Sequence, residues 1–181
     1  MIHEPGSPRR AELLDSAYAY VVEHGLATLS LRPLAKATAT SPRVLLYLFG
    51  SKDGLVAEIL ARARRTQLDL VAGLVADGRS RSLDEVVEQL WDWASVPERR
   101  GALKLFFTAY GLSLEGEPGP WAGFAEQSLA EWLPVLVDVQ RGVPRAEATI
   151  RATRALALLR GLLLQLVAGG DSTVLRAALT C

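Results

Sequence analysis

The chain has few of the residues that serve covalent or metal chemistry. Its 181 residues include one cysteine, Cys181, and two histidines, His3 and His24. A disulfide within the chain is therefore excluded, and the sequence holds no Cys/His cluster of the kind that binds zinc. A glycine-rich phosphate loop is missing as well, and no serine, histidine and aspartate suggest a hydrolase triad. We therefore expect a protein that is not an enzyme and that carries no cofactor or metal.

Long apolar runs and a strong net charge are also missing. The longest apolar stretch, 155–168, contains Arg160 and Gln165 and is shorter than the roughly 20 apolar residues that span a bilayer. The first residues do not form a charged region followed by an apolar run, so we expect no signal peptide. The 20 Lys and Arg balance the 20 Asp and Glu, which argues against a generally basic nucleoid protein. We expect a cytoplasmic protein with no membrane partner.

The alternation typical of strands is absent, and apolar residues instead recur at helical spacing between breaks of Gly, Pro and Ser. The pattern predicts an all-α protein of about nine helices. The segments predicted to be helical are approximately 8–25, 31–37, 42–48, 51–77, 82–96, 98–114, 121–140, 144–168 and a last short one that ends near 179.

The most informative segment is Ser41–Lys52. Ser41 can cap a helix whose first position is Pro42, where the missing N–H costs nothing. Arg43 and Tyr47 then lie four residues apart on one helix face. A shorter helix, which Ser30 can cap, comes before it, and only residues 38–40 separate the two. Two short helices joined by a tight turn are typical of the helix-turn-helix.

Acidic residues are absent from this part of the chain. None lies between Glu23 and Asp53. The same window contains four cations, namely Arg32, Lys36, Arg43 and Lys52. A stretch whose Lys and Arg are not accompanied by Asp or Glu indicates a surface that faces phosphates.

From about Arg9 to Leu55 the sequence resembles the tetracycline-repressor (TetR) family of bacterial transcription regulators. The matching features are the first helix that ends at Gly25, Ser30 with Leu34 and Ala35, and then Ser41, Leu45, Phe49, Ser51, Lys52 and Leu55. Two positions differ, since the family usually has Gly where Ala39 stands and Tyr where Leu46 stands. The resemblance implies a three-helix DNA-binding head, which we assign to 1–54, and a helical effector-binding and dimerisation body, which we assign to 55–181.

The head supplies the candidate DNA contacts. Arg43 is the first choice for reading a base, because arginine pairs with guanine in the major groove. Pro42 and Val44 are candidates for thymine methyls, whereas Thr40, Ser41, Tyr47, Lys52, Ser30 and Arg32 are candidates for phosphates. Tyr47 has the alternative of packing against the first helix. Arg9 and Arg10 either reach a phosphate or are solvated.

The helix predicted over 144–168 carries leucines around most of its circumference. Such a helix must be covered on all sides. A second subunit is one way to cover it and a central position in a monomer is the other; we favour a homodimer. The candidate interface residues are Ala152, Ala155, Leu159, Leu162, Leu163 and Leu166.

Aromatic residues gather in the body, where the resemblance implies a pocket for a hydrophobic small-molecule effector. The alternative for each of these side chains, which we favour residue by residue, is a place in the core. The candidates are Gln89, Trp91, Trp93, Phe106, Phe107, Tyr110, Trp121, Phe124, Trp132, Arg160 and Gln165. Arg160 is costly inside an apolar helix unless it is paired, and we expect Glu131 or Asp138 as its partner.

Together these features predict a one-component transcription regulator, a ligand-responsive repressor that binds a palindromic operator as a homodimer. The alternative is an all-helical protein-interaction or lipid-binding module without specific DNA binding. Net neutrality and Ala39 in the turn keep that alternative open.

Overall fold

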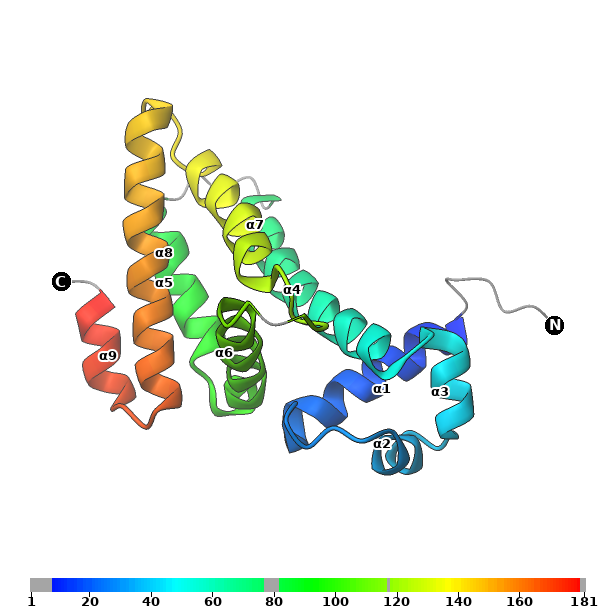
Figure 1. Cartoon of the computed structure of the whole chain (residues 1–181). Helices are drawn as coiled ribbons and strands as arrows, with labels where there is room; N and C mark the ends of the chain where they lie inside the picture. Colours follow the sequence, from blue (N-terminus) through cyan, green and yellow to red (C-terminus); the bar gives the residue numbers. More distant parts are fainter. Residues whose placement is uncertain (1–7, 77–81, 117, 180–181) are drawn as a thin grey trace. The chain divides into compact units, whose positions relative to one another are not determined.

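The computed structural model describes residues 8–76, 82–116 and 118–179, and its regular elements in these ranges are all helical (Figure 1). The helices are α1 (Pro8–His24), α2 (Leu31–Ala37), α3 (Pro42–Phe49), α4 (Lys52–Ala76), α5 (Leu83–Ala94), α6 (Arg100–Leu114), α7 (Phe124–Asp138), α8 (Arg145–Val167) and α9 (Ser172–Leu179), with a 3-10 turn at Pro97–Arg99. The predicted all-α class is confirmed.

Most predicted bounds agree with the structure to within about two residues. The helix expected over 121–140 is shorter, because α7 begins at Phe124 and ends at Asp138. The helix expected from 98 starts with the 3-10 turn, since Pro97 fixes the backbone there. The predicted stop of α4 at Asp77 and Gly78 lies outside the described residues.

The chain divides into two compact units. Unit 1 comprises Met1–Arg64 and Lys104–Phe124, and unit 2 comprises Arg65–Leu103 and Ala125–Cys181. The chain therefore passes from one unit to the other within α4, within α6 and at the first residue of α7. The functional boundary predicted after residue 54 stays a prediction.

Unit 1 has one apolar core, to which four N-terminal helices and α6 contribute. α1 buries Ala17 and Val21 at a spacing of four residues, and α4 buries Leu55 and Ile59 in the same way. The other buried residues of this core are Leu13, Leu14, Leu29, Leu34, Ala35, Leu45, Phe49, Val56, Leu60, Ala63, Leu105, Phe106, Ala109 and Phe124. The core of the N-terminal helices is thus completed by side chains from residues 105–124.

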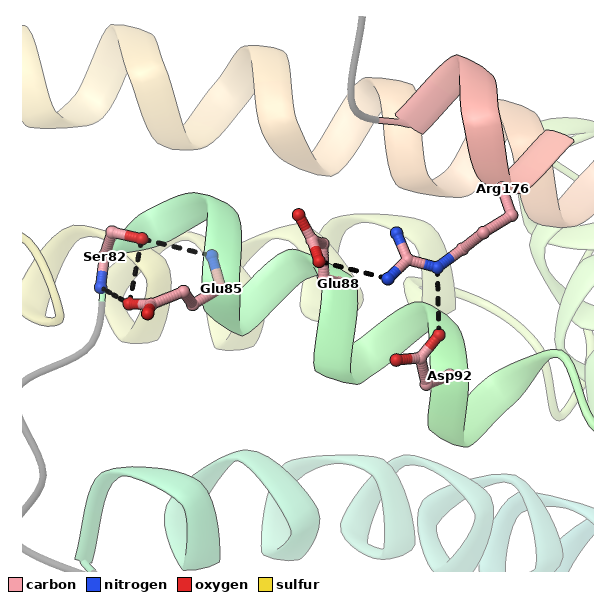
Figure 2. A network of polar contacts seen from close by, with 5 residues as sticks. All are labelled: Ser82, Glu85, Glu88, Asp92 and Arg176. Atoms are coloured by element: carbon pink, nitrogen blue, oxygen red, sulfur yellow. Dashed lines mark hydrogen bonds and ion pairs between the residues drawn. The ribbon is translucent and has the colours of Figure 1, made fainter.

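Unit 2 is built around α8, which packs against α5 and α9. Its fully or nearly buried side chains on α8 recur every three or four residues and are Ala148, Ala152, Leu156, Leu159, Leu162, Leu163 and Leu166. α5 begins with a capping box, in which Ser82 Oγ accepts from the Glu85 amide at 3.2 Å and Ser82 N donates to Glu85 Oε2 at 2.6 Å (Figure 2). This reciprocal pairing satisfies amides that would otherwise lack partners at the helix start.

An arginine on α9 joins this helix to α5. Arg176 Nη2 donates to Glu88 Oε2 and Arg176 Nε donates to Asp92 Oδ1, both at 3.0 Å (Figure 2). Glu88 and Asp92 are four residues apart and therefore share one face of α5. The hydrogen bond that Arg176 donates to Glu88, followed by the charges of Asp92 and Glu88, raises the pKa of Arg176 above its ordinary value.

The described residues provide neither a membrane-spanning helix nor a metal-binding cluster. No described helix is long and apolar enough to cross a membrane. No group of three or more His, Cys, Asp or Glu among the described residues could hold a metal ion.

Candidate nucleic-acid interface

The turn between α2 and α3 closes with two backbone hydrogen bonds. The Thr40 amide donates to the Ala35 carbonyl at 2.8 Å, and the Ala39 amide donates to the Lys36 carbonyl at 3.3 Å. This pair of bonds is the Schellman arrangement, which needs a left-handed residue just past the helix. Ala39 is that residue, with a φ of 49°, and it is the only described residue other than glycine with a positive φ. The turn therefore forms without glycine, at the steric cost that a Cβ imposes in this region.

The two serines before the helices behave differently. Ser41 Oγ accepts a hydrogen bond from the Val44 amide at 3.3 Å, so the predicted cap of α3 is confirmed. Ser30 occupies the position before α2, but its side chain makes no capping hydrogen bond. The expectation that Ser30 caps α2 is wrong, and its exposed hydroxyl remains a candidate phosphate contact.

α3 is anchored on one side and open to solvent on the other. Leu45 and Phe49 point into the core of unit 1. Arg43 is exposed, and Tyr47 is 64% exposed. Tyr47 therefore does not pack against α1, and the alternative that sequence reasoning left open for it is removed.

The end of α3 is held by an arginine from α1. Arg10 Nε donates to the Leu48 carbonyl at 3.3 Å, Arg10 Nη2 donates to Glu58 Oε1 at 2.8 Å, and the guanidinium carbon lies 5.0 Å from the centre of the Phe49 ring. Arg10 is thus neither solvated nor turned outward to a phosphate, and both expectations for it are wrong. It fixes α3 against α1 and α4. The Arg–Glu spacing of 48 residues gave no local signal for this role.

The approach of α4 to α3 requires glycine at one position. A Cβ on Gly54 would lie 2.3 Å from the carbonyl oxygen of Phe49. Such a contact is far inside van der Waals distance and involves backbone, which cannot move aside cheaply. Ser51 caps this start by accepting from the Gly54 amide at 2.8 Å.

The structure brings the predicted DNA contacts to the surface of the α2–α3 region. Seven are exposed, namely Ser30, Arg32, Ser41, Arg43, Val44, Tyr47 and Lys52, and two, Thr40 and Pro42, are half-buried. Sequence reasoning missed Leu46, which is 40% exposed although it is apolar. Its position one residue after the buried Leu45 was the available signal. The roles of these residues stay predictions.

The predicted pocket residues do not gather in one unit. Five belong to unit 1, where Phe106 and Phe124 are buried in its core and Phe107, Tyr110 and Trp121 pack against that core. Six belong to unit 2, where Trp91 and Trp132 are buried and Gln165 is exposed. The guanidinium carbon of Arg99 lies 4.1 Å from the centre of the Trp93 ring. The five unit 1 aromatics contribute to the core around α1–α4, and the effector pocket stays a prediction.

Arg160 contacts Ser128, a partner that the sequence did not suggest. Its Nη2 donates to Ser128 Oγ at 2.7 Å and to the Ser128 carbonyl at 3.3 Å. Ser128 is completely buried. Asp138 instead lies 3.8 Å from Arg145, so the expected Asp138–Arg160 pair is wrong. Arg160 is half-buried in unit 2. Gln89, on α5 of the same unit, has a buried Oε1 without a hydrogen-bond partner.

The predicted dimer residues also face inward. Ala152, Leu159, Leu162, Leu163 and Leu166 are buried by the chain itself, and Ala155 is half-buried. This choice of residues was therefore wrong, because the covered stripe of α8 is its inner face. The outward face of α8 carries other apolar or small residues, namely Ile150, Ala157, Leu158, Gly161 and Leu164.

Described residues of unit 2 line two open grooves. One, of about 990 Å³, lies along α8 and the turn before it and is lined by Ser82, Leu83, Asp84, Val139, Gln140, Arg141, Val143, Arg151, Arg154, Ala155, Ala157 and Leu158. The other, of about 690 Å³, lies between α5 and α9 beside Arg176. Of the predicted pocket residues, only Trp91 lines either of these grooves.

Comparisons with known proteins relate this region to a family. Residues 13–59, which span the helix-turn-helix and its supports, match the model described as bacterial regulatory proteins, tetR family. This segment of the chain is similar to that family. No match was found among curated proteins.

Solved structures of transcriptional regulators share the fold over almost the whole chain. A TetR transcriptional regulator from Legionella pneumophila is 17% identical, with 97% of each chain covered and a TM-score of 0.73. A regulator from Saccharomonospora viridis, solved in complex with choline, is 20% identical, with 97% of this chain and 95% of that chain covered and a TM-score of 0.79. A transcriptional regulator from Rhodococcus sp. Rha1 is 22% identical, with coverages of 94% and 91% and a TM-score of 0.72.

Proposed function

We propose that this protein is a TetR-family DNA-binding regulator, a ligand-responsive repressor that binds a palindromic operator as a homodimer. The observation that carries the proposal is the outward face of α3. A capped eight-residue helix presents Arg43 and Tyr47 to solvent in a window without acidic residues. A helix of this kind fits the major groove of DNA.

The proposed contacts divide into two kinds. Arg43 reads a base, because its guanidinium can donate twice to guanine O6 and N7. Thr40, Ser41, Tyr47 and Lys52 bind phosphates around α3, and Ser30 and Arg32 bind the backbone at the start of α2. Pro42 and Val44 contact thymine methyls. The phosphate contacts fix the register, and the base contacts give the sequence preference.

The outward face of α8 supports the homodimer. Leu158 is 43% exposed and Leu164 is 50% exposed, and the small residues Ala157 and Gly161 between them allow a second helix to approach closely. Val174 on α9 is also exposed. Two such faces related by a two-fold axis would bury each other.

A ligand-responsive body is proposed from the fold and from one relative. The Saccharomonospora viridis regulator is described in complex with choline, so a body of this fold can hold a small organic molecule. In the chain described above, we propose a hydrophobic effector that acts by binding one of two conformations more tightly, since only differential affinity shifts such an equilibrium. The protein would act in the cytoplasm, where its operator lies.

Selection of bound sequences from random duplex DNA tests the proposal. We expect a palindrome with half-sites about one helical turn apart, roughly 34–36 Å, and an affinity that falls steeply with salt. Absence of enrichment from a folded, dimeric protein, repeated with and without a panel of hydrophobic compounds and choline, would contradict it.

The dimer has a separate test. Leu164→Glu should yield monomers in analytical ultracentrifugation and weaken operator binding, whereas Leu129→Glu on α7, at a position 39% exposed, serves as the matched control. If Leu164→Glu leaves the protein dimeric, this face is not the interface.

A further inference from the structure

The outward face of α3 carries two exposed aliphatic side chains, Val44 and Leu46. Val44 is 38% exposed and Leu46 is 40% exposed, and both lie between Arg43 and Tyr47 in the sequence, so that four of the eight residues of the helix are exposed. Ordinary solvated helices place charged residues at such positions. A partner that presents apolar groups would remove these two aliphatic side chains from water.

Helical geometry places the four side chains relative to one another. At 3.6 residues per turn, Arg43 and Tyr47 point almost opposite to the buried Leu45 and Phe49. Val44 and Leu46 then lie on the two edges of the outward face, one on each side of the Arg43–Tyr47 line. An elongated partner seated on this face therefore meets an arginine and a tyrosine at its centre and an aliphatic side chain at each edge.

The charge around the face selects an anionic partner. Arg32, Arg43 and Lys52 are exposed, and the absence of acidic residues extends from residue 24 to residue 52. An apolar protein surface would gain nothing from this cationic border. DNA supplies the matching anions, and the one apolar group that it displays in the major groove is the C5 methyl of thymine.

Hydrogen bonding on this face is limited to few groups. Within α3, only Arg43 and Tyr47 present exposed polar side chains. The hydroxyl of Ser41, just before the helix, is already held by the Val44 amide. Direct hydrogen-bond readout can thus cover few base pairs, and further discrimination has to come from shape and from methyl contacts.

We propose that Leu46 and Val44 are specificity-determining residues that recognise thymine methyls on either side of the base pair read by Arg43. The half-site then has a guanine flanked by thymines, one facing each edge of α3. This inference rests on the proposed function, since it assumes that α3 enters the major groove. It adds to the proposed function the bases that the operator contains, and it assigns a role to Leu46.

Replacement of thymine by deoxyuridine tests the proposal, because it removes the methyl and keeps every hydrogen-bonding group of the base pair. Each thymine of the selected half-site is replaced in turn, and the dissociation constant of the full-length protein is measured. We expect about a fourfold loss of affinity at each contacted thymine, the factor that burial of one methyl-sized group supplies.

A double-mutant cycle assigns each methyl to its side chain. In Leu46→Ala, deoxyuridine at the thymine facing Leu46 should no longer weaken binding, whereas the thymine facing Val44 should keep its effect. Val44→Ala should show the reverse. Leu129→Ala, which removes a comparably exposed leucine of α7, should keep both effects.

Three results distinguish the possibilities. Loss of affinity with deoxyuridine that disappears in the matching alanine variant supports the inference. Specific binding to a palindrome that lacks these thymines, or a deoxyuridine effect that persists in both variants, overturns the inference and leaves the proposed function intact. Absence of specific binding to any duplex overturns both.

Discussion

Arg10 Nη2 donates to Glu58 Oε1 at 2.8 Å, and the same guanidinium also reaches the carbonyl of Leu48. One side chain of α1 thereby holds the last turn of α3 and the second turn of α4. The position of α3, the helix proposed to bind DNA, therefore depends on an arginine that faces the protein interior.

The first prediction follows from this relationship. Arg10→Met should lower the free energy of unfolding by about 1–2 kcal/mol, because a charge-assisted hydrogen bond is lost in a partly buried site. It should also weaken operator binding without changing the slope of log affinity against log salt, since no phosphate contact is removed. Arg9→Met is the control, because Arg9 is exposed and lies only near Glu12. A reduced salt slope in Arg10→Met would show that Arg10 binds phosphate after all.

A second prediction separates base reading from phosphate binding. Arg43→Ala should cost about 1–3 kcal/mol for the preferred operator and relax the preference at one base pair. Lys52→Ala should weaken binding to all sequences alike and reduce the salt slope by about one. Binding of a library of single base-pair variants at two salt concentrations checks both. An even loss over all sequences in Arg43→Ala would argue against base reading.

The third prediction concerns the turn. Ala39 has a φ of 49°, where an L residue with a Cβ costs roughly 1–2 kcal/mol. Ala39→Gly should therefore stabilise the protein by about 0.5–1 kcal/mol, since part of the relief is lost to the greater chain entropy of glycine when unfolded. Urea denaturation measures the change. Ala27→Gly, in the exposed loop before α2, is the control for the entropy of the unfolded chain. Destabilisation by Ala39→Gly would mean that the turn is not strained.

The fourth prediction concerns Arg176. Arg176→Met should destabilise the protein by only about 0.5–1 kcal/mol, because the Glu88 and Asp92 side chains are 39% and 60% exposed and water screens the pairs. Hydrogen exchange of α9 should rise more than that of α8. Arg145→Met, whose pair with Asp138 is more exposed, should have a smaller effect.

The pH dependence of this contact has a definite sign. The pKa of Arg176 is raised on folding, so the contribution of its charge is kept through the neutral and mildly alkaline range and is lost only above the ordinary arginine value. We therefore expect no change in the effect of Arg176→Met across the neutral range. Thermal denaturation at several neutral and mildly alkaline pH values checks this, and a decline within that range would contradict the assignment.

Local signals in the sequence were sufficient for the elements of the DNA-facing region. The cap at Ser41, the proline after it and the helical spacing of Leu45 and Phe49 all act within a few residues, so α3 and the turn before it could be read directly. The capping box of Ser82 and Glu85 is another local signal, of the S-x-x-E form.

Contacts between distant residues could not be read in this way. Arg10 with Glu58 and Arg160 with Ser128 are separated by 48 and 32 residues, and no local pattern specifies them. The inner and outer faces of α8 were also confused, because its leucines occur on both. Only the packing of α5 and α9 onto the helix shows which stripe is covered.

Residues 105–124 contribute buried side chains to the core of unit 1, and this limits which fragments of the protein can fold on their own. A fragment that ends at residue 54 would lack Leu55, Ile59, Phe106 and Phe124, all buried in that core. A chimera that joins this DNA-facing region to the effector body of another regulator would lose the same support. Exchange of operator specificity between such proteins is therefore better attempted by replacing the outward residues of α3 than by exchanging whole segments.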